Sequence, residues 1–105
     1  MPTKKLAGKD VEVTQEGFLV NPGDWSEEMA PELAAQVGID ELTELHWKVV
    51  KFIRADFQER KQIPTLRRIK NAGGVPIKEI YRLFPDGPAK KAAMISGLGK
   101  PEGCV

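Results

Sequence analysis

Apolar and polar residues alternate near the beginning of the chain, in short runs separated by glycines. Between Lys4 and Val20 the apolar positions recur at about every second residue, and Gly8 and Gly17 interrupt the runs. Alternation of this kind, broken by glycine turns, is typical of antiparallel strands. We therefore expect a small β-hairpin that covers part of the core.

The pattern then changes to the period of a helix. Apolar residues recur at four-residue spacing from Met29 to Val37, and a glycine stops the run. Asp24 and Glu27 have the spacing of a capping box that would open this first helix. Because Pro31 is awkward inside a helix, the alternative start is between Ser26 and Met29, with Pro31 still in the first turn.

The clearest helix follows Thr43 and extends to about Arg60. Thr43 is a suitable N-cap because its hydroxyl group can accept a hydrogen bond from a free backbone N–H. The apolar face of this helix contains Leu42, His46, Val49, Val50, Ile53 and Phe57. The opposite face contains Lys48, Lys51, Arg54, Gln58 and Glu59. An amphipathic pattern of this length predicts the central helix of the core.

Three shorter helices complete the expected fold. They cover residues 65–72, 77–84 and 88–96, and each begins next to a proline. The first two are joined by adjacent glycines and resemble a helix-turn-helix unit. The predicted fold class is mainly α, within α+β: five helices, an N-terminal β-hairpin, a helix-turn-helix-like part and a flexible C-terminal arm.

Length and composition indicate one globular domain, expected over residues 1–97, followed by the arm over residues 98–105. The chain has 105 residues, of which 41% are hydrophobic. Gly99, Pro101 and Gly103 disfavour a helix in the arm, which carries Cys104. Roughly seven extended residues reach on the order of 25 Å, enough to bring a thiol into the cleft of another protein.

Charge and cysteine usage narrow the possible partners. Sixteen basic and fifteen acidic residues leave a net charge of +1, so no overall field attracts nucleic acid or a membrane. The single cysteine excludes an intramolecular disulfide and a multi-cysteine metal site. A free thiol fits a reducing compartment, and no apolar run has the length of a membrane span. We expect a cytoplasmic monomer without a metal or other cofactor.

Two residues could carry chemistry, and each has two interpretations. Cys104 is either an incidental residue of a frayed end or a thiol presented to other proteins. His46 is either a packed residue with one satisfied nitrogen or a base for that thiol. A zinc site is disfavoured because one histidine and one cysteine are too few ligands.

Basic and aromatic side chains also have more than one interpretation. The short helices carry Arg67, Arg68, Lys70, Lys78 and Arg82. These cations form a solvated face, a docking surface for an anion or partner, or phosphate contacts of a DNA-binding unit, and the near-zero net charge argues against the last. The aromatic residues Trp25, Trp47, Phe52, Phe57, Tyr81 and Phe84 are interpreted as packing in the core or at its edge.

Four segments of the chain form a recognisable pattern: residues 42–47 (LTELHW), 64–67 (PTLR), 80–90 (IYRLFPDGPAK) and 97–105 (GLGKPEGCV). Together they closely resemble the DsrC/TusE family of sulfur-relay proteins, which includes the gamma subunit associated with dissimilatory sulfite reductase. The resemblance implies a compact helical domain with a flexible arm. It also implies that Cys104 accepts sulfur as a persulfide, that Arg67 lies where a retracted arm can dock, and that Lys100 and Gly103 belong to the family's arm pattern.

One departure from the family pattern changes the expected chemistry. The sulfite-reductase type has a second cysteine eleven positions before the penultimate one, and that position is Ala93 here. An intramolecular disulfide or a bridging trisulfide therefore cannot form. Gly99 and Glu102 also replace a proline and a small polar residue of the usual arm, which should loosen the arm and make its tip more acidic.

The leading hypothesis is a single-cysteine sulfur carrier, rather than a self-sufficient enzyme, whose partners are sulfur donor and acceptor proteins. One alternative is a non-carrier gamma-type subunit or regulator that docks on a partner similar to sulfite reductase or heterodisulfide reductase. The other is a helix-turn-helix DNA-binding regulator that uses the region from Arg67 to Leu83.

Overall fold

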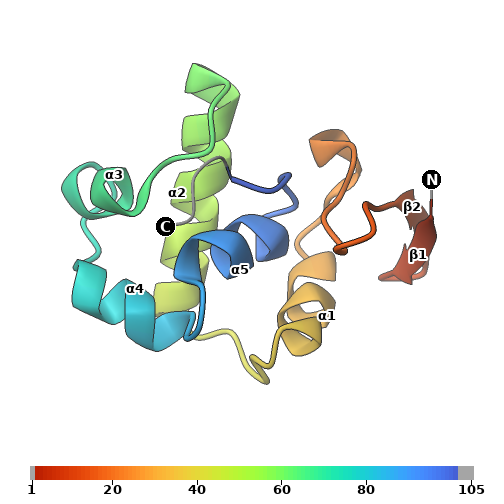
Figure 1. Cartoon of the computed structure of the whole chain (residues 1–105), viewed down its shortest axis with the longest axis horizontal. Coiled ribbons are helices and arrows are strands. Elements are labelled where there is room, and N and C mark those ends of the chain that lie inside the picture. The colour runs from red at the N-terminus through yellow and green to blue at the C-terminus, as the bar shows by residue number, and fades with distance from the viewer. Residues whose placement is uncertain (1, 102–105) are drawn as a thin grey trace.

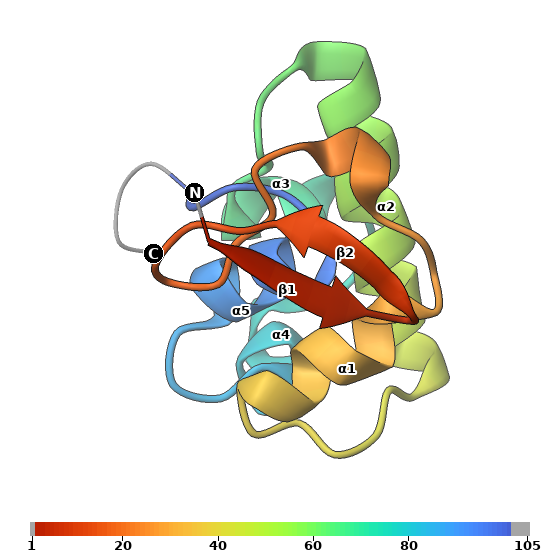
Figure 2. The ribbon, with the colours of Figure 1, turned by 90° about the vertical axis from the view of Figure 1, so that its right-hand side faces the viewer.

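The N-terminal alternation forms the predicted hairpin. In the computed structural model, which describes residues 2–101, β1 (Thr3–Leu6) pairs antiparallel with β2 (Lys9–Glu12). The alternating register turns Leu6 and Val11 toward the core, where both are almost fully buried. Figure 2 shows the hairpin lying across one side of the helices.

Five α-helices follow the hairpin, as the sequence predicts. A short 3₁₀ turn, η1 (Pro22–Asp24), precedes them. The helices are α1 (Met29–Gln36), α2 (Glu44–Arg60), α3 (Leu66–Asn71), α4 (Ile77–Leu83) and α5 (Pro88–Ile95).

The capping box predicted at Asp24 and Glu27 is wrong. Asp24 closes the 3₁₀ turn, in which the Asn21 side chain accepts a hydrogen bond from the backbone N–H of Gly23 at 3.0 Å. This turn ends before the helical period begins, and α1 starts at Met29 without a side-chain cap. Pro31 therefore lies in the first turn of α1, as expected.

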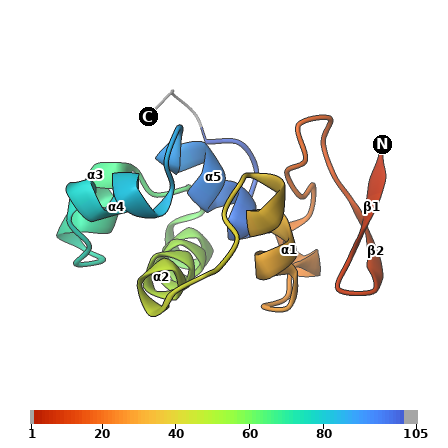
Figure 3. The same cartoon turned by 90° about the horizontal axis from the view of Figure 1, so that it is seen from below.

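Helix α5 is the centre of the packing. It contacts α1 on one side, and α2 and α4 on the other. Figures 1 and 3 show α3 and α4 together at one end of the molecule and the hairpin at the opposite end, outside α1. The core is continuous through these elements and includes Leu33, Ile53, Ile80 and Ile95.

His46 links the start of α2 to the end of α4. Its Nδ1 accepts a hydrogen bond from the backbone N–H of Thr43 at 3.0 Å, and its Nε2 donates to the carbonyl oxygen of Leu83 at 2.9 Å. Thr43 caps α2 in return, which completes a capping box. The imidazole is buried and meets the ring of Phe84 edge-on. The interpretation of His46 as a packed residue is confirmed, with both nitrogens engaged.

We expect the His46→Ala substitution to lower the free energy of unfolding by about 2–4 kcal/mol, because it removes the side-chain half of the capping box and leaves the buried Leu83 carbonyl group without a partner. The His46→Gln variant can keep the capping box but cannot replace the link to Leu83, so it should lose about half as much. Urea unfolding of the two variants measures both values. Equal losses in the two variants would contradict a separate contribution from the cap.

Candidate functional site

The backbone after α5 turns sharply at Gly97. The N–H of Gly97 donates to the carbonyl of Met94, and the N–H of Leu98 donates to that of Ala93, both at 3.0 Å. Gly97 has a φ of +76°, the left-handed conformation that ends a helix in this way. The turn fixes the direction in which the C-terminal segment leaves the core.

Trp25 and Arg54, which lie far from this turn in the sequence, contact it directly. The indole Nε1 of Trp25 donates to the carbonyl of Ile95 at 2.8 Å. The guanidinium group of Arg54 stacks 4.2 Å from the centre of the Trp25 ring and donates to the carbonyls of Ser96 and Pro22 at 2.8 and 3.2 Å. Two long-range contacts therefore hold the last turn of α5.

Arg54 lies on the polar face of α2, as expected, but it is partly buried there. Burial lowers the pKa of the Arg54 guanidinium from its ordinary value, yet its hydrogen bonds to two carbonyls satisfy the charge. The helical period alone places Arg54 opposite the apolar face. Only the approach of Trp25, from a distant part of the chain, gives it a partly buried partner.

The described part of the C-terminal segment remains close to the globular domain. Leu98, the first residue of the expected arm, is only 1% exposed and belongs to the core. Lys100 then places its Nζ 3.3 Å from a carboxylate oxygen of Glu16, whose other oxygen lies 3.7 Å from Nζ of Lys90. These three side chains are about half exposed, so water screens the ion pairs.

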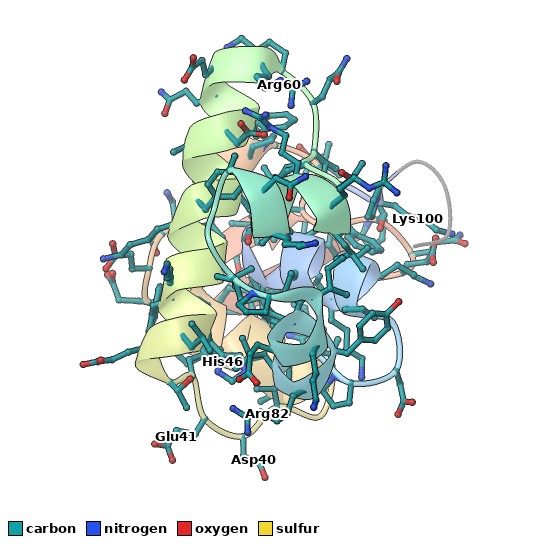
Figure 4. All side chains as sticks on the ribbon, turned by 90° about the vertical axis from the view of Figure 1, so that its left-hand side faces the viewer. Asp40, Glu41, His46, Arg60, Arg82 and Lys100 are labelled. Atoms are coloured by element: carbon teal, nitrogen blue, oxygen red, sulfur yellow. The ribbon has the colours of Figure 1, made fainter. Side chains whose placement is uncertain are left out.

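Lys100 also lines a surface hollow of about 510 Å³ beside the end of α2. A second hollow, of about 350 Å³, shares Gln62, Ile63 and Thr65 with the first and extends along α3. Arg60, Arg67 and Arg68 line this second hollow, which we call the arginine hollow. The two hollows therefore adjoin across the 61–65 loop, and the described chain ends beside them (Figure 4).

Asp56 binds two of the arginines that line the arginine hollow. Its carboxylate accepts hydrogen bonds from Nε of Arg68 at 3.0 and 2.9 Å and from Nη2 at 2.6 Å. Nη1 of Arg60 lies 3.9 Å from the same carboxylate. The hydrogen bonds from Arg68 lower the pKa of Asp56, against the opposing effect of burial, and raise the pKa of Arg68. Asp56 therefore fixes α3 to α2.

A third hollow, of about 370 Å³, lies between α3 and α4 and is lined by Arg67, Ile77 and Tyr81 among others. Tyr81 is 50% exposed, so it lies at the edge of the core and not within it. Ile80 and Leu83 take the buried positions of α4.

The structure brings two of the predicted site residues into adjoining hollows and separates a third. Arg67 is exposed on α3, and Lys100 lines the neighbouring hollow. Ala93 is buried in α5 at 1% exposure. Cys104 and Gly103 lie outside the described residues. Sequence reasoning missed the roles of Asp56 and Arg54, because a charged residue inside an amphipathic helix gives no local sign of a distant partner.

Residues 2–101 contain no group of three histidine, cysteine, aspartate or glutamate side chains placed to bind a metal ion. Over the same part of the chain, no helix has the length and apolar character needed to cross a membrane.

Comparison with known proteins gives concordant results for sequence and fold. Residues 5–105 match the family described as DsrC like protein. The chain is 45% identical to sulfurtransferase TusE of Yersinia pseudotuberculosis, over 96% of this chain and 99% of that protein. It is 36% identical to the gamma subunit of the dissimilatory-type sulfite reductase of Nitratidesulfovibrio vulgaris, over 93% of each chain. The solution structure of DsrC from Allochromatium vinosum superimposes with a TM-score of 0.82 at 38% identity, covering 98% of this chain and 97% of that one.

Proposed function

The chain belongs to the DsrC-like protein family, and on this basis we propose that it acts in sulfur relay and carries sulfur as a persulfide on Cys104. The relatives named as a sulfurtransferase and as a sulfite reductase gamma subunit support the sulfur-relay role. They do not favour the two alternatives raised by the sequence, a regulator without sulfur chemistry and a DNA-binding protein.

The single observation that carries the assignment to Cys104 is that the chain has one cysteine. Sulfur relay through a thiol therefore has one possible carrier atom in this protein. In the proposed step, the Cys104 thiolate attacks the outer sulfur of a donor persulfide, the donor thiolate leaves, and Cys104 holds the transferred sulfur. A thiolate of the acceptor protein then attacks that sulfur and restores the Cys104 thiolate.

The position of Ala93 limits this chemistry to one thiol. A family member with a second cysteine at this position could close a bond within the chain, but Ala93 offers only a buried methyl group. The persulfide of Cys104 must therefore be discharged onto another molecule. We propose that the donor and acceptor are both proteins, that they meet a monomer in the cytoplasm, and that no cofactor takes part.

The contacts of Leu98 and of the turn before it fix the point at which the C-terminal segment leaves the globular domain. Leu98 is buried, and Trp25 and Arg54 hold the turn before it. Cys104 is the third residue after Pro101 in the sequence, and three extended residues span at most about 11 Å. The partner must therefore approach the face that carries Lys100.

The test is the intact mass of the protein after incubation with glutathione persulfide. We expect the wild-type chain to gain the mass of one sulfur atom and to lose it on addition of dithiothreitol, whereas Cys104→Ser should gain none. The Thr3→Ala variant is a control for an unrelated side-chain change on the exposed part of β1, and it should load as the wild type does. A sulfur atom retained on Cys104→Ser, or no loading of the wild type, would refute the carrier assignment.

A further inference from the structure

The arginine hollow has the charge of an anion-binding site. Its lining includes Arg60, Arg67 and Arg68 but no carboxylate, because Asp56 lies behind Arg68 rather than in the wall. When Asp56 and Glu59, the two carboxylates that act on Arg68, are counted with the three arginines, the cluster still has an excess of one positive charge. A hollow with this excess attracts a small dianion more strongly than a neutral ligand.

Asp56 also holds two of the guanidinium groups close together. Arg68 chelates the carboxylate with Nε and Nη2, and Arg60 approaches the same carboxylate to 3.9 Å. Both side chains remain partly open to solvent, at 43% for Arg60 and 37% for Arg68. Both residues line the hollow, and the partner that they share restricts their side chains, which reduces the entropy lost when an anion binds.

Arg67 differs from its neighbours because its guanidinium makes no ion pair with any carboxylate among residues 2–101. It is exposed on α3 and lines the arginine hollow beside Thr65 and Asn71. A planar guanidinium with free N–H groups binds tetrahedral and planar oxyanions through paired hydrogen bonds. The threonine hydroxyl and asparagine amide add neutral donors to the same wall.

We propose that the arginine hollow binds a sulfur oxyanion, with thiosulfate as the ligand, and presents its outer sulfur to Cys104. This inference rests on the proposed carrier function of Cys104, and it adds a second, inorganic source of sulfur. The hollow adjoins the one lined by Lys100, and the segment from Pro101 to Cys104 can span up to about 11 Å. A tether of this length starts next to Lys100, in the hollow that adjoins the arginine hollow.

The transfer step needs no oxidant or reductant. After the thiol has given its proton to water, the Cys104 thiolate attacks the outer sulfur of thiosulfate. The S–S bond of thiosulfate breaks, and its electron pair leaves with sulfite. The products are the Cys104 persulfide anion and sulfite, so atoms and charge balance. The arginines stabilise the sulfonate group, on which negative charge increases as sulfite departs.

Binding is tested first in the full-length Cys104→Ser chain, which cannot react. Sodium thiosulfate, sulfate and phosphate are titrated at constant ionic strength while the amide resonances of Thr65, Arg67 and Asn71 are followed by NMR. We expect saturable shifts with thiosulfate and with sulfate, its unreactive analogue. Adding Arg67→Gln should weaken both by about tenfold, because it removes a charge-assisted pair of hydrogen bonds.

Arg82→Gln is the matched control because it removes the same charge from α4. Figure 4 shows Arg82 near the His46 end of α2, at the opposite end from Arg60. Its side chain is 73% exposed and pairs with Glu79. This control should bind thiosulfate as the parent does. Non-saturating shifts, or equal affinities of Arg67→Gln and Arg82→Gln, would overturn the site. Phosphate binding about tenfold tighter than thiosulfate would overturn its assignment to sulfur oxyanions.

Transfer is tested next in the wild-type chain. Thiosulfate should add one sulfur atom to Cys104 and release one sulfite, and Arg67→Gln should slow this loading by about tenfold. Loading by glutathione persulfide should be less affected, since that donor does not need the hollow. Thiosulfate binding without loading would overturn the transfer step. Loading by the persulfide without thiosulfate binding would refute this inference alone, whereas failure of both donors to load a protein that binds thiosulfate would refute the carrier function.

Discussion

The Gly97→Ala variant should lose about 3 kcal/mol of stability, through two independent effects. A Cβ atom at this position would lie 2.3 to 2.6 Å from three atoms of Trp25, so the indole group must move. Alanine is also strained at a φ of +76°. Displacement of Trp25 breaks its hydrogen bond to Ile95 and removes the surface on which Arg54 stacks. Urea unfolding measures the loss, and the indole N–H resonance of Trp25 reports the broken contact.

Gly99→Ala is the matched control for this prediction. Gly99 lies two residues further along the same segment, and a Cβ atom there meets no other atom within 4 Å. We expect its unfolding midpoint and the Trp25 resonance to be unchanged. If Gly99→Ala destabilises the protein as much as Gly97→Ala does, the effect comes from the segment in general and not from the contact with Trp25.

The second large effect should follow the loss of the Asp56 carboxylate. Asp56→Asn removes the charge that holds Arg68 and Arg60, and at pH 7 we expect a loss of about 1–2 kcal/mol, limited by the solvent that reaches the outer face of the pair. Glu79→Gln is the control, because it breaks an exposed pair with Arg82 and should change stability much less.

The contribution of Asp56 should also depend on pH. The hydrogen bonds from Arg68 lower the pKa of Asp56 in the folded protein below its unfolded value of about 3.9. The stabilising contribution is therefore fully present above the unfolded pKa and is lost as the pH falls through the lower, folded pKa. Unfolding curves at pH 7 and pH 3 should show that wild type and Asp56→Asn differ less at the lower pH. A difference that grows on acidification would contradict this sign.

If Asp56→Asn also lowers the affinity of the arginine hollow for thiosulfate, the two roles of Asp56 are linked. Asp56 carries negative charge, so its removal would strengthen anion binding through charge alone. A weaker affinity can therefore come only from lost positioning of Arg60 and Arg68. The direction of the change in thiosulfate affinity therefore distinguishes the positioning role of Asp56 from its electrostatic role.

Short-range rules predicted most of the secondary structure. Glycine and proline limit backbone conformation locally, and Thr43 caps α2 whatever its distant surroundings are. The one clear failure at this level, the capping box at Asp24 and Glu27, came from a competing local turn that Asn21 caps. Two local interactions with similar sequence patterns were in competition, and spacing alone could not rank them.

The sequence by itself determined the five helices, the hairpin, the family pattern and the presence of a single thiol, because each depends on residues near one another in the chain or on composition. The tertiary structure alone decided which charged residues have partners. Arg54 meets Trp25, Asp56 holds Arg68, and Lys100 reaches Glu16. The physical reason is that electrostatic and stacking energies depend on distances between side chains, and folding sets those distances for residues that lie far apart in the sequence.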